Sequence, residues 1–152
     1  MKALLGTYFF VVLALLAGMM MPAQAAINNR LAGFLENPVL AAFVSFVIGT
    51  IALFIYILIA GIPLGNLASL KQATFVSWTG GVLGAFFVAS AVILVPRLGV
   101  ALTFSLIIAG QMAITLVLDH YGFLGVPVRE VSVLRLVGIA MIISGVVLIR
   151  RF

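Results

Sequence analysis

Long apolar runs without charge, separated by short polar breaks, dominate the chain. The first extends from Ala3 to Ala26, and four more follow it. None shows the strict alternation of apolar and polar residues that marks the strands of a membrane barrel. A helix needs about 20 apolar residues to cross the hydrocarbon core. There the backbone must satisfy its own hydrogen bonds. The pattern therefore predicts an all-α membrane protein.

Five transmembrane helices account for the pattern, in a single transmembrane domain that covers residues 1–152. We expect these helices at residues 3–34, 38–60, 74–95, 98–118 and 131–149. Asn37 suits the N-cap of the second helix, with Pro38 at its first position. Pro96 is expected to end the third helix. The fifth has few uncharged residues, so Arg135 is expected to snorkel to the interface.

The first 26 residues also allow another interpretation. Lys2, the apolar stretch and Ala23-Gln24-Ala25 resemble a cleavable secretory signal. The stretch is longer than the apolar core of a typical signal, and the residues that follow it are membrane segments as well. We therefore expect a retained first helix, with the cleaved signal as the alternative.

Composition narrows the function. The chain is 66% hydrophobic and 7% charged, against about 25% charged residues in a soluble domain. With no cysteine and one histidine, a metal site or other cofactor is not expected. The basic residues are scattered between the apolar runs and are not gathered on one face, which favours membrane anchoring over nucleic-acid binding. No acid lies inside a span and no catalytic motif is present. We expect no catalytic residues and no enzyme.

The positive charges do not favour either orientation. With five spans, four basic residues fall on each side of the membrane: Lys2, Lys71, Arg129 and Arg135 on one, and Arg30, Arg97, Arg150 and Arg151 on the other. One interpretation is a weak bias, with orientation set by other factors. The other is dual topology, in which copies insert both ways and pair antiparallel, as in the inverted repeats of many transporters. We favour the second.

The first helix holds the best candidates for a binding site. Pro22 clashes with the carbonyl of Gly18, which predicts a kink with a freed carbonyl. The alternative is that the helix ends at Pro22. If it continues, Gln24 and Asn28 share one face. Amides are costly in a membrane unless they bond to a partner helix or a substrate.

Two further residues are candidates for the wall of a substrate cavity. Gln111 lies near the middle of the fourth span, where it either bonds another helix or lines a polar pocket. Trp78 stands near the start of the third span, where it is either an interface residue or a surface on which a ligand stacks.

Asp119 and His120 are an acid and an imidazole that directly follow the fourth span. Together they are candidates for proton coupling. The alternative, which we favour, is an interfacial cap with Tyr121 as an aromatic anchor.

Small residues at helical spacing predict close helix packing. Gly80 and Gly84 form a GxxxG pattern in the third span, and Gly138 and Gly145 lie seven apart in the fifth. In a dimer, the fifth helix is a natural contact.

Taken in order, these motifs resemble the YdcZ-like family of the drug/metabolite transporter superfamily. The resemblance runs from about Gly18 to Ile149. The motifs are Gly18-xxx-Pro22-x-Gln24-xxx-Asn28-xx-Leu31, Ser45-Phe46-xx-Gly49-Thr50, Trp78-x-Gly80-Gly81-xx-Gly84-Ala85-Phe86, Pro96-Arg97-Leu98-Gly99, Ala109-Gly110-Gln111 and Leu118-Asp119-His120-x-Gly122.

The resemblance implies a five-helix half of a 5+5 inverted-repeat transporter, which exports small molecules across the bacterial inner membrane. Related small multidrug resistance transporters work as antiparallel dimers. In that group the first helix carries an essential glutamate, whereas this chain has no acid in its first span. Proton antiport therefore does not carry over directly. Coupling would have to use Asp119 and His120, or the region of Gln24 and Gln111.

The leading hypothesis is an antiparallel homodimer that moves a small organic solute by alternating access. Its cavity would be lined by Gln24, Asn28, Trp78 and Gln111. A paralogue is the alternative partner. Two other functions remain open: a dual-topology channel for a small ion, and a membrane assembly protein that transports nothing.

Overall fold

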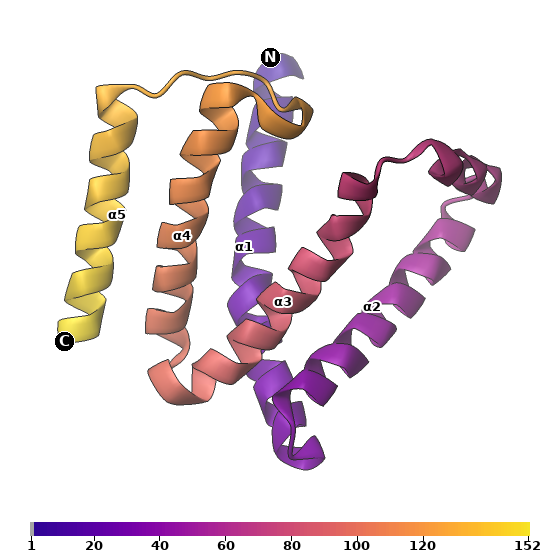
Figure 1. The fold of residues 1–152 in the computed structure, drawn as a ribbon, viewed down its shortest axis with the longest axis horizontal. Coiled ribbons are helices and arrows are strands. Elements are labelled where there is room, and N and C mark those ends of the chain that lie inside the picture. Colours follow the sequence, from indigo (N-terminus) through magenta and orange to yellow (C-terminus); the bar gives the residue numbers. More distant parts are fainter. Residues whose placement is uncertain (1) are drawn as a thin grey trace. The chain divides into compact units, whose positions relative to one another are not determined.

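The computed structural model describes residues 2–152, and the side chains from residue 6 onward. Five helices in this part of the chain are long and apolar enough to cross a membrane (Figure 1). They are α1 (Lys2–Leu35), α2 (Pro38–Ile59), α3 (Phe75–Leu98), α4 (Val100–Tyr121) and α5 (Val133–Arg151). Two short 3₁₀ segments, η1 (Leu64–Gln72) and η2 (Phe123–Gly125), lie in the connections. The predicted all-α fold with five spans is confirmed at this level.

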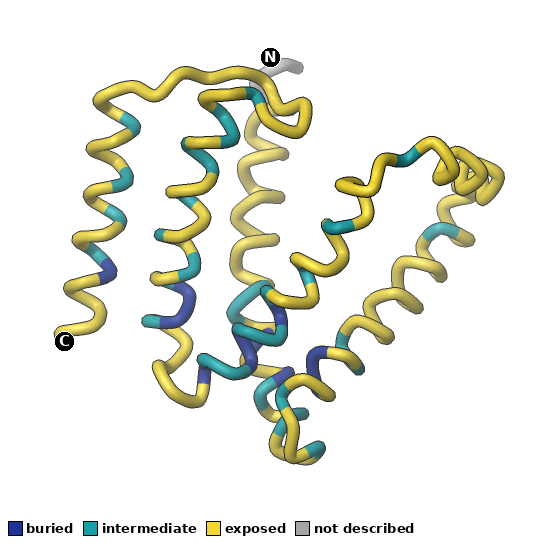
Figure 2. The backbone as a smooth tube through the Cα atoms, viewed as in Figure 1, coloured by how far each residue is buried: buried dark blue, intermediate teal, exposed yellow. Residues whose placement is uncertain are grey.

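Most side chains of these helices face outward. In four of the five spans only 6% of the most apolar window is buried, and in α3 the value is 17%. Figure 2 shows exposed positions along most of each helix. A soluble protein does not expose apolar surface on this scale. The outward faces therefore suit contact with lipid.

The chain divides into two compact units, one up to Pro96 and the other from Arg97 to Phe152. In the first unit, the end of α1, the start of α2 and the second half of α3 share a small core. Ala41 and Ala42 of α2 are buried in it with Val88 and Val92 of α3. Leu31, Ala32 and Leu35 of α1 pack against this cluster. The two alanines let the helices approach closely, as small residues do in membrane proteins.

A tight connection joins α1 to α2. Glu36 adopts a left-handed conformation with φ of 53°, directly after the last residue of α1. The Asn37 side chain then accepts hydrogen bonds from the backbone N–H groups of Val39 at 2.8 Å and Leu40 at 3.1 Å. Asn37 is therefore the N-cap and Pro38 the first helical residue, as predicted.

Two prolines that were considered as helix ends, Pro22 and Pro96, both lie inside helices. Helix α1 continues through Pro22 to Leu35, so the alternative of a helix that ends at Pro22 is not observed. Helix α3 likewise passes Pro96 and ends at Leu98. Proline removes its own N–H and crowds one carbonyl, which a helix tolerates near its end or in a membrane.

Glycines with positive φ mark the boundaries of α4 instead. Gly99 precedes the helix with φ of 77°, and Gly122 caps it with φ of 61°. A Cβ at Gly122 would lie 2.7 Å from the Cγ2 atom of Val128, so this position favours glycine twice over. Helix α4 therefore extends to Tyr121, beyond the expected end at residue 118. Asp119 and His120 lie in its last turn.

Helices α4 and α5 pack against each other within the second unit (Figure 1). Helix α5 begins after Ser132, whose side-chain oxygen accepts a hydrogen bond from the backbone N–H of Arg135 at 3.3 Å. Added Cβ atoms at Gly138 and Gly145 would meet no atom within 4 Å. These two positions are open in the single chain, and their part in a helix contact stays a prediction.

Candidate functional site

A pocket of about 520 Å³ lies between α1 and α2 within the first unit. Its polar lining comes from Gln24 and Asn28 of α1 and from Ser45 of α2. Methionine and aliphatic side chains of the same two helices, with Ala23, form the rest of the wall. A largely apolar pocket of this size with a few polar groups is typical of small-molecule sites.

A smaller pocket of about 200 Å³ shares Gln24 and Ser45 with the first and extends along α2 past Gly49 and Thr50. Thr50 donates its hydroxyl to the carbonyl of Phe46 at 2.8 Å, which leaves the Thr50 oxygen free only to accept. Gln24 and Ser45 therefore stand where the two pockets meet. The two pockets are thus adjacent, and polar side chains line both of them.

The α1–α2 connection explains why the helices separate at this level. The tight turn and the alanines of α2 hold the two helices together near Pro38, and they diverge from there (Figure 1). Ser45 is seven residues into α2, or about 10 Å along its axis. Asn28 is eight residues before Glu36, or about 12 Å along α1. The pocket thus lies within the spans and close to this end of the hairpin.

Asn28 is the residue that sets this pocket apart. Its side chain is only 4% exposed, and its Nδ2 atom has no hydrogen-bond partner. Among the residues whose side chains are described, no other buried side-chain nitrogen or oxygen lacks a partner. The other buried polar residue among them is Thr103 of α4, which donates its hydroxyl to the Gly99 carbonyl at 2.6 Å. An unsatisfied buried donor costs about 1–3 kcal/mol. A partner from outside the chain would offset this cost.

Among the side chains that the structure describes, none that lines either pocket is charged. The nearest charges along α1 and its connection, Arg30 and Glu36, are exposed. The site therefore offers neutral hydrogen-bonding groups only, in an apolar wall. It has no acid to take up a proton and no counter-ion for a charged ligand.

The structure brings together two of the four expected cavity residues. Gln24 and Asn28 share the pocket, as their four-residue spacing predicted. Trp78 is 57% exposed on α3 and lines neither pocket. Gln111 is exposed on α4, in the second unit. The roles of Trp78 and Gln111 in a cavity stay predictions.

Ser45 is a pocket residue that the sequence did not single out as one. In the sequence it belongs to the motif Ser45-Phe46-xx-Gly49-Thr50, and small or hydroxyl-bearing residues at such spacing equally serve helix packing in lipid. One feature of the sequence could have indicated its position: Ser45 follows closely after the expected turn between the first two helices. A residue seven positions after the turn faces the last turns of α1.

The expected kink lies beside the pocket, because Met21 and Ala23, the neighbours of Pro22, both line it. Pro22 is inside α1 and half-buried, and an added Cβ at Gly18 would meet no atom within 4 Å. Since proline has no N–H, it cannot supply the helical hydrogen bond to the Gly18 carbonyl. The predicted bend at this point remains a prediction.

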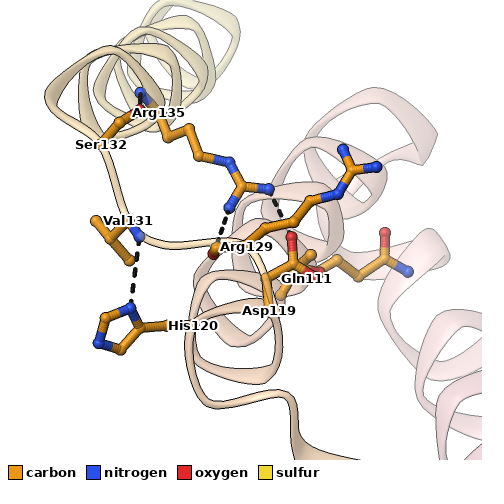
Figure 3. A network of polar contacts seen from close by, with 8 residues as sticks. Gln111, Asp119, His120, Arg129, Val131, Ser132 and Arg135 are labelled. Atoms are coloured by element: carbon orange, nitrogen blue, oxygen red, sulfur yellow. Dashed lines mark hydrogen bonds and ion pairs between the residues drawn. The ribbon is translucent and has the colours of Figure 1, made fainter. Parts of the chain in front are cut away.

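A separate polar network joins the end of α4 to the start of α5 (Figure 3). The Arg135 guanidinium donates one hydrogen bond to Asp119 Oδ2 at 2.5 Å and another to the Arg129 carbonyl at 3.1 Å. The backbone N–H of Arg129 donates to the Asp119 carbonyl at 2.8 Å. The Arg135 guanidinium on α5 therefore bonds both to α4, through Asp119, and to the segment between the two helices, through Arg129. Both charged side chains are partly exposed, as expected for groups near the membrane interface.

His120 takes part in the same connection. Its Nδ1 atom accepts a hydrogen bond from the backbone N–H of Val131 at 3.5 Å. Its ring packs edge-on against the ring of Tyr121, with 4.7 Å between the ring centroids. Asp119 and His120 thus both have partners in this connection, and the interfacial cap stays a prediction. Proton coupling through them stays a prediction. Gln111 is drawn in the same view, with no bond to the network (Figure 3).

The network makes a testable prediction about stability. Arg135→Gln removes the ion pair with Asp119, so we expect it to lower the free energy of unfolding by up to about 1 kcal/mol, the range for a partly exposed pair. Chemical denaturation of the purified protein in detergent would measure this.

Arg129→Gln is the matched control, because Arg129 joins the network through its backbone N–H and carbonyl. It should have little effect. Equal loss of stability in the two variants would contradict a specific role for the Arg135 fork.

Comparison with known proteins places the chain. A family model described as "Putative inner membrane exporter, YdcZ" matches residues 9–148. The match covers both units, including the pocket and the α4–α5 network. The chain matches no curated protein and no solved structure.

Proposed function

Because the chain belongs to the YdcZ family of inner-membrane exporters, we propose that it exports a small organic solute held in the pocket between α1 and α2. Family membership and five apolar helices make it a multi-pass inner-membrane transporter. The solute, the site and the mechanism are the proposal.

Asn28 is the observation that carries the site assignment. A buried donor without a partner lies at a pocket that is large enough for a small molecule and is placed within two spans. The Gln24 amide and the Ser45 hydroxyl converge on the same space. In a bundle that needed only structural hydrogen bonds, the cost of this unsatisfied donor would serve no purpose.

We propose alternating access in an antiparallel homodimer, with each copy as one half of a 5+5 inverted repeat. The equal number of basic residues on the two sides supports insertion in both orientations. The low burial within each span leaves ample surface for a facing copy. Trp78 and Gln111 are exposed in the single chain, so they are available to complete a shared cavity. The predicted bend at Pro22 would let α1 move beside the site.

Export should depend on the two amides of the pocket. Cells that produce the wild-type chain would be compared with cells that produce the Gln24→Ala, Asn28→Leu double variant, by mass spectrometry of the medium. Each lost hydrogen bond costs about 1 kcal/mol, so we expect solutes enriched by the wild type to fall at least about tenfold at equal protein level.

Gln72→Ala is the control for this experiment, because Gln72 is exposed in η1 and lines neither pocket. It should secrete as the wild type does. Unchanged secretion by the double variant would refute the site, and no enrichment by the wild type over empty cells would refute export.

The antiparallel dimer makes a separate prediction about topology. The chain contains no cysteine, so Gly65→Cys and Phe152→Cys each introduce a single label. If copies insert both ways, a membrane-impermeant maleimide should label each position from both sides of the inner membrane. Labelling of each position from one side only would contradict the antiparallel homodimer and favour an oppositely oriented paralogue.

A further inference from the structure

The chemistry of the pocket limits what it can hold. We infer that the site selects an uncharged solute with an acceptor oxygen, such as a carbonyl or an amide, on a compact apolar body. This inference rests on the proposed function and specifies its substrate class. It follows from three features of the pocket: the unpartnered donor, the absence of charge, and the apolar wall.

The donor specifies an acceptor on the ligand. Nδ2 of Asn28 carries two N–H groups and has no partner in the described part of the chain. The atom itself is buried. The terminal torsion of asparagine is broad, so a small rotation turns the amide toward a ligand oxygen. Gln24 and Ser45, which donate and accept, then bind a second polar group on the ligand.

The missing charges exclude ionic ligands. From residue 6 onward, neither pocket is lined by an acid that would neutralise a cation or by a basic residue that would neutralise an anion. Moving an isolated charge into such surroundings costs far more than one or two hydrogen bonds return. Both charged forms of a solute are therefore rejected by the same wall.

The apolar wall specifies the rest of the molecule. Met20, Met21, Ile27, Leu31 and Ile48 surround the polar groups. Methionine is flexible and polarisable, and it adapts to ligands of different outline. The site thus fits a compact hydrophobic body, with its polar end held by the three polar side chains.

Three probes of nearly equal shape separate these possibilities. 2-Naphthamide is uncharged, 2-naphthoate is an anion, and 2-naphthamidinium is a cation, and each carries a planar group of three heavy atoms on the same ring system. Equilibrium dialysis against the full chain in lipid nanodiscs would give the three dissociation constants. We expect the amide to bind at least tenfold more tightly than either ion.

The Asn28 variants assign the effect to one atom. Asn28→Leu should weaken binding of the amide probe about fivefold to tenfold. Asn28→Asp, of nearly the same shape, exchanges the donor for a carboxylate and should shift preference toward the cation. Asn29→Leu is the matched control, since Asn29 is the next residue and does not line the pocket. It should bind the amide as the wild type does.

Each result bears on a different claim. Binding of either ion as tightly as the amide, or no measurable binding of the amide, overturns the inference. Equal loss with Asn29→Leu overturns the role of Asn28. If the amide binds through Asn28 but no solute is exported, the proposed function fails and the selectivity stands. If export depends on Gln24 and Asn28 but the solutes are ions, the function stands and this inference fails.

Discussion

A polar side chain that is buried within a membrane span needs a hydrogen-bond partner, and Asn28 has none among the described residues. The same requirement shapes the rest of the chain. Backbone groups are satisfied within five helices. The hydroxyls of Thr50, Thr103 and Ser144 donate to carbonyls of their own helix or its cap. Among the buried side-chain atoms of the described residues, the Asn28 amide nitrogen is the exception, and for this reason we propose that another molecule binds there.

The hairpin of α1 and α2 creates that place by simple geometry. Glu36 in its left-handed conformation and the Asn37 cap reverse the chain within two residues. Ala41 and Ala42 then allow the helices to touch near the turn. Further along, the helices separate enough to leave a pocket, with Ser45 facing the amides of α1. The packing at one end and the pocket further along thus follow from the same short segment.

The five spans could be predicted from the sequence because apolar runs report burial in lipid directly. Helix ends were less predictable. Asp119 and His120 seemed a natural end for the fourth helix, but α4 continues to Tyr121 and is capped by Gly122, because glycine adopts positive φ without strain. The ion pair of Asp119 with Arg135 was not foreseen. It depends on how the connection after Gly122 folds back, which no local pattern encodes.

The candidate site was predictable where one helix determines it. Gln24 and Asn28 share a pocket because residues four apart share a helical face. Ser45 required knowing which face of α2 meets α1, and its small side chain indicated packing equally well. Trp78 and Gln111 lie on other helices, and sequence spacing within a helix says nothing about which helices face each other.

The central claim is that the space between α1 and α2 receives a solute from water, although it lies within the spans. The most direct measurement is the rate at which Ser45→Cys reacts with a small membrane-impermeant maleimide, compared with Val47→Cys on the same helix. Val47 is 42% exposed and lines neither pocket, so its thiol would face lipid and stay protonated and slow. We predict that the thiol at position 45 reacts with the maleimide much faster than the thiol at position 47. Equal, slow reaction at both positions would mean that the pocket is closed to solutes, and would contradict the proposed binding site.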